Sequence, residues 1–248
     1  MSHVRQTYTW WVGLVVVVVG LVPLPTFAGD KNFEVFPGDG VDSPPLVYKV
    51  KDNRGTITDR NTGLIWEQKL AEDDPACTAL AQAERSVHCV NNAYTWSRIN
   101  TDPDCTGTAP DGTLFTDFLF RLNHRCAKDE TIPCTRNDDC DKVGGKCGFA
   151  GYRDWRIPNI RELQSIVDYG RCAVNDEFDT CQDEAAIHPD FSPTAPHNYW
   201  SSTSTVAEPT LAWIVNFDDG DGDSSCKDKL SRPDNGTLLY GRAVRGGR

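Results

Sequence analysis

Residues 151–168 read GYRDWRIPNIRELQSIVD, and this stretch contains the clearest local structural signal in the chain. Asn159 can cap a helix through its side-chain oxygen, and Glu162, three residues later, completes a pattern similar to a capping box. An apolar face follows at helical spacing, formed by Ile160, Leu163, Ile166 and Val167. The sequence therefore predicts a helix over residues 160–168 that packs against a core.

Short strands are predicted on both sides of this helix. Upstream, residues 46–50 and 56–59 flank the sequence DNRG, which favours a tight turn. Residues 64–66 follow a second turn, so this region is expected to form a β-meander. Downstream, aromatic and β-branched residues predict strands at residues 199–202, 212–217 and 238–244.

Two further segments are expected to be helical. Residues 94–100 are compatible with a brief helix. A longer apolar stripe at helical spacing consists of Leu114, Phe115, Phe118, Leu119 and Leu122. This stripe predicts a second, buried helix. Helices and strands separated by long polar connections indicate an α+β fold, and no linker divides it into two domains.

Residues 126–148 differ from the rest of the chain, because they are charged and cysteine-dense and have almost no large apolar side chains. They are expected to form an inserted disulfide knot. The ten cysteines are Cys77, Cys89, Cys105, Cys126, Cys134, Cys140, Cys147, Cys172, Cys181 and Cys226. Their even number predicts five disulfides, and the absence of a Cys-x-x-Cys pair disfavours zinc. Short loops favour the local pairs Cys77–Cys89 and Cys172–Cys181, and the remaining connectivity stays open.

Residues 1–28 have the order of a signal peptide. The only charged side chain is Arg5, residues 12–22 are apolar apart from glycine, and prolines precede a small-residue cleavage site at Ala28. The prolines interrupt the apolar run too early for a membrane anchor, the alternative interpretation. We therefore expect a mature domain over residues 29–248 without a transmembrane span, located outside the cytoplasm: secreted, periplasmic or at the cell surface.

The composition restricts the classes of partner. The chain has a formal net charge of −11 at pH 7, and the loss of Arg5 with the signal peptide makes the mature domain more negative by a single charge. Such a surface repels polyanions at long range, so nucleic acid is not an expected partner. Hydrophobic residues make up 39% of the chain and Met1 is the only methionine, so the core is expected to depend on aromatic residues and cross-links.

Several sequence blocks, in the same order and at similar spacing, resemble the Lcl C-terminal domain family. These blocks are GTITD at 55–59, NTGLIWE at 61–67, GYRDWRIPN at 151–159, YWSST at 199–203, AWIVNF at 212–217 and GRAVR at 241–245. The resemblance covers residues 47–245. It implies a C-type-lectin-like fold with two helices, short antiparallel sheets, adjacent amino- and carboxy-terminal strands, and long loops.

The resemblance also implies a function in binding. The family takes its name from the binding domain of a bacterial collagen-like adhesin that engages sulfated polysaccharides. This chain differs in having no collagen-like Gly-X-Y stalk and in carrying the cysteine-rich insertion. Its acidity disfavours a sulfated ligand unless basic residues gather locally. The candidates for such a cluster are Arg153, Arg156, Arg242, Arg245 and Arg248.

Candidate ligand-binding residues come from a comparison with calcium-dependent lectins. The nearest counterparts of their sugar-binding loop and strand are Glu208-Pro209-Thr210 and Trp213-Ile214-Val215-Asn216. The candidate set is Trp200, Glu208, Trp213 and Asn216. Tryptophans within apolar segments are more often core than sugar-stacking platforms, so we expect Trp155, Trp200 and Trp213 to be buried.

The acidic sequence DDGDGD at residues 218–223 is a candidate calcium loop, with Asp218, Asp219, Asp221 and Asp223 as ligands. Its spacing differs from an EF-hand, because Ser224 stands in the glycine position and Leu230 in the glutamate position. A solvated turn is the favoured interpretation, so no cofactor is predicted and calcium is left as an open alternative.

The sequence contains no recognisable catalytic motif. Ser201 and Ser202 lack the flanking glycines of a nucleophile elbow. Single histidines in polar contexts are usually solvated, and these are His88, His124, His188 and His197. We therefore predict a binding module rather than an enzyme, with a carbohydrate or another surface polymer as ligand and the loops of residues 172–223 as its site. A structural secreted or envelope subunit is the alternative, and the oligomeric state is left open.

Overall fold

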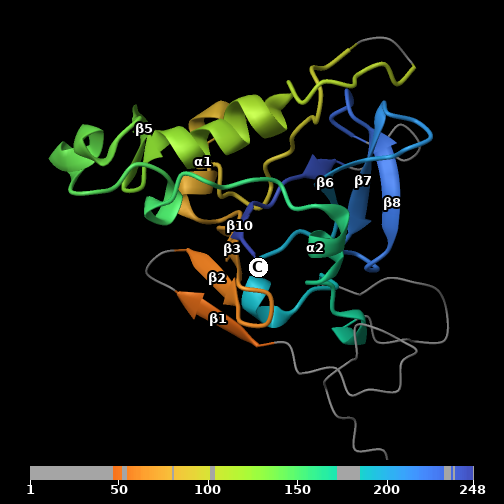
Figure 1. Cartoon of the computed structure of the whole chain (residues 1–248), viewed down its shortest axis with the longest axis horizontal. Helices are drawn as coiled ribbons and strands as arrows, with labels where there is room; N and C mark the ends of the chain where they lie inside the picture. The colour runs from red at the N-terminus through yellow and green to blue at the C-terminus, as the bar shows by residue number, and fades with distance from the viewer. Residues whose placement is uncertain are drawn as a thin grey trace, which may run out of the picture. The chain divides into compact units, whose positions relative to one another are not determined.

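The part of the chain that we describe, from a computed structural model, is built on two four-stranded sheets and a two-stranded hairpin (Figure 1). The described residues are 47–51, 55–79, 81–100, 104–171, 185–231, 236 and 238–247. They all belong to one unit, Lys31–Arg248. The predicted signal peptide and the predicted Cys172–Cys181 pair lie outside the described residues.

The first sheet contains the predicted meander. Its order is β1 (Tyr48–Lys51), β2 (Thr56–Asp59), β3 (Leu64–Glu67) and β10 (Val244–Gly246), and all neighbouring strands are antiparallel. In β10, Val244 pairs with Trp66 of β3. The carboxy-terminal strand therefore lies beside β3, whereas β1 occupies the opposite edge of this sheet.

The second sheet has the order β8 (Gly222–Cys226), β7 (Leu211–Asn216), β6 (Asn198–Ser204) and β9 (Leu239–Tyr240). Its strands are antiparallel except for the parallel pair β6 and β9. The prediction of one strand over residues 238–244 is wrong. The chain leaves the second sheet after Tyr240 and enters the first sheet at Val244, so this segment connects the two sheets.

The two predicted principal helices are present. The buried stripe forms a π-helical segment, Leu114–Leu119, that continues as α1 (Phe120–His124). Helix α2 (Ile160–Gln164) has the predicted reciprocal capping bonds between Asn159 and Glu162 but is shorter than predicted. Short 3₁₀ turns occur at η1 (Pro75–Cys77), η2 (Gln82–Glu84), η4 (Asn137–Val143), η5 (Phe149–Gly151), η6 (Tyr169–Arg171) and η7 (Pro189–Phe191).

The predicted helix at residues 94–100 is wrong, because this segment bonds to distant backbone instead of to itself. The Tyr94 N–H donates to the carbonyl of Leu239 at 2.8 Å, and the Ser97 N–H donates to that of Lys227 at 2.7 Å. The side chains of Tyr94 and Trp96 are buried. Burial of these aromatics between long-range partners therefore outweighs local helix formation.

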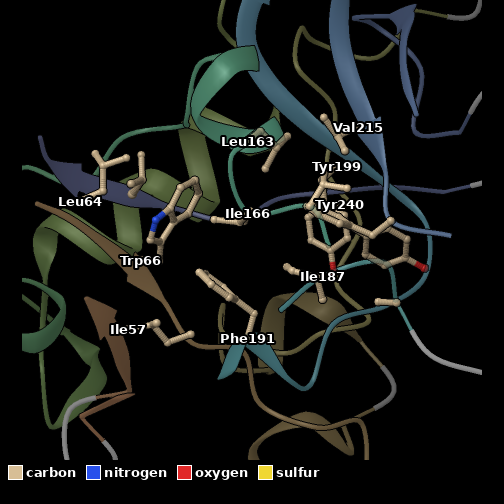
Figure 2. Packing of buried hydrophobic residues seen from close by; sticks show 14 residues of the cluster. Ile57, Leu64, Trp66, Leu163, Ile166, Ile187, Phe191, Tyr199, Val215 and Tyr240 are labelled. Atoms are coloured by element: carbon tan, nitrogen blue, oxygen red, sulfur yellow. The ribbon is translucent and has the colours of Figure 1, made fainter. Parts of the chain in front are cut away.

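The core consists of two apolar clusters. The first joins both sheets and α2; in Figure 2, Trp66, Phe191 and Tyr199 point into the space between them. The second cluster surrounds Trp155 and Trp200, which are 3% and 0% exposed, as predicted. The prediction is wrong for Trp213, which is 38% exposed on β7.

Four disulfides link the described cysteines: Cys77–Cys89, Cys105–Cys226, Cys126–Cys140 and Cys134–Cys147. The first confirms the local pair predicted from the sequence. The last two hold the cysteine-rich insertion, which includes β4 (Arg125–Cys126) and β5 (Asp129–Pro133). Mixed helices and short sheets confirm the α+β class. Among the described residues, no helix has the length and apolarity needed to cross a membrane.

Candidate functional site

The residues predicted to bind a ligand do not form one site. Trp200 is fully buried and donates through its indole N–H to the carbonyl of Tyr94 at 2.8 Å. Glu208 is exposed before the start of β7, and Asn216 is at its end. The six-residue strand separates them by about 17 Å, at roughly 3.4 Å per residue. Trp213 alone keeps an exposed aromatic surface.

The predicted calcium loop is a tight turn between β7 and β8. Asn216 and Asp219 bond side chain to side chain at 3.1 Å, and the Asp219 carboxylate accepts from the Asp221 N–H at 2.8 Å. Gly220 has φ of +86°, and a β-carbon there would lie 2.7 Å from Val167. Burial and the neighbouring Asp219 raise the pKa of Asp218.

The carboxylates of this turn are not gathered as a chelating group. Among the described residues, three or more potential metal-ligand atoms come within 4.8 Å of one another only at Cys126, Cys134 and Cys140. These cysteines are engaged in disulfides. Instead, the Asp219 carboxylate accepts a hydrogen bond from the backbone N–H of Asp221, which is the arrangement of an Asx turn.

A cleft of about 630 Å³ lies beside the cysteine-rich insertion, outside the region predicted to bind a ligand. One wall comes from Gly55, the segment after β3, Val87, His88 and the start of α1. The opposite wall comes from the insertion and the residues on either side of it. Its lining residues there are Arg125, Cys126, Ala127, Lys128, Glu130, Gly144, Gly145, Lys146, Phe149, Ala150 and Gly151. In Figure 1 this region, around α1 and β5, lies far from β8.

A buried charged network lies behind the cleft. One oxygen of Glu67 accepts from the Lys69 ammonium at 3.0 Å and contacts His88 Nδ1 at 2.8 Å. Its other oxygen accepts from the Ala243 N–H at 3.0 Å. Burial alone would raise the pKa of Glu67, but Lys69, His88 and this N–H together hold it below its usual value. Glu67 is therefore a buried anion that joins β3 to the segment before β10.

Lys69 and Arg242 complete this network. Burial lowers the pKa of Lys69 to about 8 against the opposing effect of Glu67, and its ammonium lies 4.5 Å from the Phe118 ring centre. Arg242 is fully buried and donates to the Glu67 carbonyl at 2.8 Å and the Thr194 hydroxyl at 2.7 Å. Most polar atoms of this network are therefore paired within the protein, which indicates that the network supports the fold rather than a ligand. The buried Nε of Arg242 is an exception, because it has no hydrogen-bond partner among the described residues.

His88 connects the network to the cleft. Its side chain lines the cleft, and its ring lies 4.1 Å from that of Phe149. The expectation of a solvated histidine is wrong here, because His88 is only 9% exposed and is held by Glu67. Its Nε2 is 3.8 Å from a carboxylate oxygen of Glu130.

Glu130 attaches the insertion to the rest of the domain. Its carboxylate accepts from the Ser86 hydroxyl at 2.7 Å and from Arg121 at 3.0 Å. The Val87 N–H adds a third bond at 3.3 Å. Arg121 is thus neutralised within the cleft by Glu130, and its guanidinium also contacts Asp117 at 3.9 Å.

The remaining cations of the cleft form no salt bridge with a carboxylate among the described residues, although the charge of Arg125 acts on Asp117. These are Arg125, Lys128 and Lys146. Arg125 donates to the Thr131 carbonyl at 3.2 Å, and its buried Nε has no hydrogen-bond partner among the described residues. Lys128 and Lys146 are exposed. One wall of the cleft therefore carries three cations beside the single carboxylate Glu130.

The arginines that the sequence suggested as an anion cluster are engaged within the protein where the structure describes them, and Arg156 and Arg245 both lie near Asp154. Arg156 is bound by both carboxylate oxygens of Glu162, at 2.6 and 2.7 Å, and Arg245 bonds Asp154 at 2.7 Å. Arg153 donates to the carbonyl of Thr135, Arg242 is buried as described above, and Arg248 lies outside the described residues. The basic residues that line the cleft are different ones: Arg121, Arg125, Lys128 and Lys146.

The sequence model of the Lcl C-terminal domain matches residues 55–235. The chain belongs to this family. The matched span includes the cysteine-rich insertion and both walls of the cleft. A search of curated proteins found no match. The match confirms the resemblance of the sequence blocks that lie within it, whereas GRAVR at 241–245 lies beyond the matched residues. NTGLIWE and GRAVR contain the buried charges Glu67 and Arg242.

Proposed function

We propose that this Lcl C-terminal domain is a secreted or cell-surface binding module with a C-type-lectin-like fold, and that it binds a carbohydrate or another surface polymer in the cleft. It is not an enzyme in this proposal. The cleft carries the proposal, because it combines an open cavity of about 630 Å³ with charged side chains and the aromatic ring of Phe149. Concave sites with a few converging polar groups are typical of ligand binding.

Other features support the same function. Two helices, short antiparallel sheets and long connections accord with a C-type-lectin-like fold. Disulfides persist mainly in oxidising compartments, and four join the described cysteines. The histidine in the cleft is held between two carboxylates. Among the described residues that line the cleft there is no serine, and the cysteine there, Cys126, is in a disulfide. This arrangement suits recognition better than acyl transfer.

A glycan array probed with the mature protein, with and without calcium, tests the function. Ala127→Trp should weaken binding at least tenfold, because Ala127 is exposed in the cleft wall and the indole would occupy the cavity. Ala207→Trp is the matched control, since Ala207 is equally exposed but lies in the β6–β7 loop. Binding that Ala207→Trp abolishes and Ala127→Trp spares would move the site to the β6–β7 region.

A further inference from the structure

We propose that the four cysteines of the insertion form a binding site for a soft metal ion such as Zn²⁺ when their two disulfides are reduced. The sulfur atoms of Cys126, Cys134 and Cys140 all lie within 4.8 Å of one another, and all three side chains are buried. Cys147 is bonded to Cys134 within the same cluster and supplies the fourth sulfur. The inference is independent of the proposed binding function, because it concerns the core of the insertion and not the ligand of the cleft.

The four sulfurs need only small movements to reach the geometry that zinc prefers. Zinc binds four thiolates as a tetrahedron at about 2.3 Å, which places the sulfurs about 3.8 Å apart. Sulfurs from both disulfides already lie within 4.8 Å of one another, and the Cα atoms of each bonded pair are 5.6 Å apart. Rotation about the Cα–Cβ bonds is therefore enough to separate each pair. The spacing of the cysteines along the chain does not predict this cluster, because η4 and the β4–β5 hairpin bring them together.

Backbone hydrogen bonds hold these cysteines near one another independently of the disulfides. Cys126 and Cys147 pair with each other as an antiparallel bridge. The Cys134 N–H donates to the carbonyl of His124 at 2.9 Å, at the end of α1. Cys140 lies within the 3₁₀ segment η4. The ligand positions are therefore defined by local secondary structure, which is not lost simply because a sulfur–sulfur bond opens.

The insertion depends on cross-links, and a metal can replace them. Its buried cluster consists of the four cysteines, and only Ile132 and Val143 pack partly against it. So few apolar side chains cannot offset the entropy of ordering the segment. A metal ion bound by four thiolates adds its binding free energy to the stability of the segment that supplies them. Zinc should therefore restore the order that reduction of the disulfides removes.

The cleft gives a reductant and a metal ion a route to this cluster. Cys126 lines the cleft together with Arg125 and Lys146, which directly precede Cys126 and Cys147 in the sequence. Four thiolates around Zn²⁺ carry a net negative charge, and neighbouring cations offset it. None of the four cysteines is more than 4% exposed. A closed site with four protein ligands is the arrangement of structural zinc rather than of catalytic zinc.

The conversion of the disulfides to a metal site balances with a dithiol as the reductant. Each disulfide takes two electrons and two protons from one dithiol, which itself becomes a disulfide, so two dithiols release four thiols. Zinc then takes the place of the thiol protons, which pass to the solvent. Thiolate ligands select zinc over Mg²⁺ and Ca²⁺, because those harder ions prefer oxygen.

The test uses the mature protein reduced with a phosphine, because a dithiol would itself bind zinc. Each phosphine takes an oxygen atom from water as one disulfide becomes two thiols. Cys126→Ser together with Cys134→Ser, the insertion variant, removes one sulfur from each disulfide of the insertion. The matched control is Cys77→Ser with Cys89→Ser, which removes two sulfurs outside the insertion. Co²⁺ is titrated first, since its visible absorption reports tetrahedral thiolate coordination, and Zn²⁺ is then used to displace it. Mg²⁺ serves as the hard-metal control.

We expect reduced wild type and the reduced control to bind Co²⁺ and Zn²⁺ with similar affinity, and the insertion variant to bind at least about a hundredfold more weakly. Wild type with its disulfides intact should bind as weakly as the insertion variant. Failure of reduced wild type to bind either metal would overturn the site. Equal binding by the insertion variant and the control would do the same, and a loss confined to the control would move the site to Cys77 and Cys89.

Hydrogen exchange of reduced wild type tests the site without any substitution. Zn²⁺ should slow the exchange of the amides of β4 and β5 at least about tenfold relative to the metal-free reduced protein, and Mg²⁺ should not. Zinc that leaves these amides unprotected would contradict the proposal even if metal is bound, because the ion would then lie outside the insertion.

Discussion

The two-sheet body and the cysteine-rich insertion are held together by different forces. In the body, large aromatic side chains such as Trp66, Trp200 and Phe217 are completely buried between the sheets and helices. In the insertion, the buried cluster consists of Cys126, Cys134, Cys140 and Cys147, with only Ile132 and Val143 packed partly against it. Apolar burial thus stabilises one region and covalent cross-links stabilise the other.

This difference explains where the cations of the cleft lie. A segment of this size cannot bury enough apolar surface to offset the entropy of ordering its backbone, so it needs cross-links to keep a defined shape. Because its surface is not needed for packing, it can display charge. The body has the opposite constraint, and its charged side chains Glu67, Lys69 and Arg242 are buried and hydrogen-bonded to other groups of the body. Variants in the body should therefore lower stability through lost apolar burial, and variants in the insertion through lost cross-links.

The largest effect is expected in the body, for Trp200→Ala. Truncating this fully buried indole on β6 should lower the free energy of unfolding by about 3–5 kcal/mol. Trp213→Ala on the neighbouring strand β7 is the matched control, because this side chain is 38% exposed, and its cost should be below about 1 kcal/mol. Urea unfolding of both variants measures the difference. Similar losses in the free energy of unfolding for the two variants would contradict the difference in burial between Trp200 and Trp213.

The next effect should be confined to the insertion. Replacing Cys126 and Cys140 with serine removes a cross-link over 14 residues and should lower local stability by about 2–4 kcal/mol. Hydrogen exchange should show this loss in the amides of β4 and β5, while the amides of β6 and β7 change by less than about 1 kcal/mol. An equal loss of protection in both regions would show that the insertion and the body unfold as one unit.

A smaller effect is expected at acid pH from the buried charge of Glu67. The pKa of Glu67 is lowered in the folded protein, so ionised Glu67 contributes stability above its unfolded pKa, near 4.5. This contribution is lost as pH falls through the folded pKa. The stability of wild type should therefore fall more steeply below pH 4.5 than that of Glu67→Gln, by at most about 1.4 kcal/mol per pH unit.

Chemical denaturation between pH 2 and 7 measures these acid slopes. The exposed glutamate variant Glu208→Gln is the control for removal of one carboxylate. Parallel acid limbs for wild type and Glu67→Gln would contradict a buried, ionised Glu67. A difference that is constant above pH 5 and shrinks below it would confirm the assignment.

The sequence predicted those features that depend on local pattern. The capping residues Asn159 and Glu162 mark the start of α2, and the turn sequences mark the meander, because both signals act over a few residues. Burial of Trp155 and Trp200 follows from their apolar context. Trp213 has the same apolar context but is partly exposed on β7. Alternate residues of a strand point to opposite faces of the sheet, and composition does not tell which face is buried.

The cleft was missed because it depends on contacts between distant segments of the chain. Glu67 meets His88 across 21 residues and the Ala243 N–H across 176, and no local spacing encodes such contacts. A signal was nevertheless present: Glu67 and Arg242 are charged residues within otherwise apolar segments, LIWE and GRAV, which is unusual unless the charges are paired. The positive wall was hidden by the negative net charge, which averages over the whole chain.

The smallest expected effect concerns calcium at the turn between β7 and β8. The Asp219 carboxylate is engaged by the Asp221 N–H and the Asn216 amide, and Asp221 and Asp223 are exposed. A calcium ion would need several of these oxygens to converge, which requires breaking the bonds that close the turn. Calcium should therefore shift the melting temperature no more than magnesium at equal concentration, since both screen the same negative charge. Differential scanning calorimetry of wild type and Asp221→Asn measures this. A saturable shift that is specific for calcium and absent in Asp221→Asn would contradict the prediction, because only a bound ion stabilises by mass action in this way. Such a result would place a calcium site in the body, at the turn between β7 and β8.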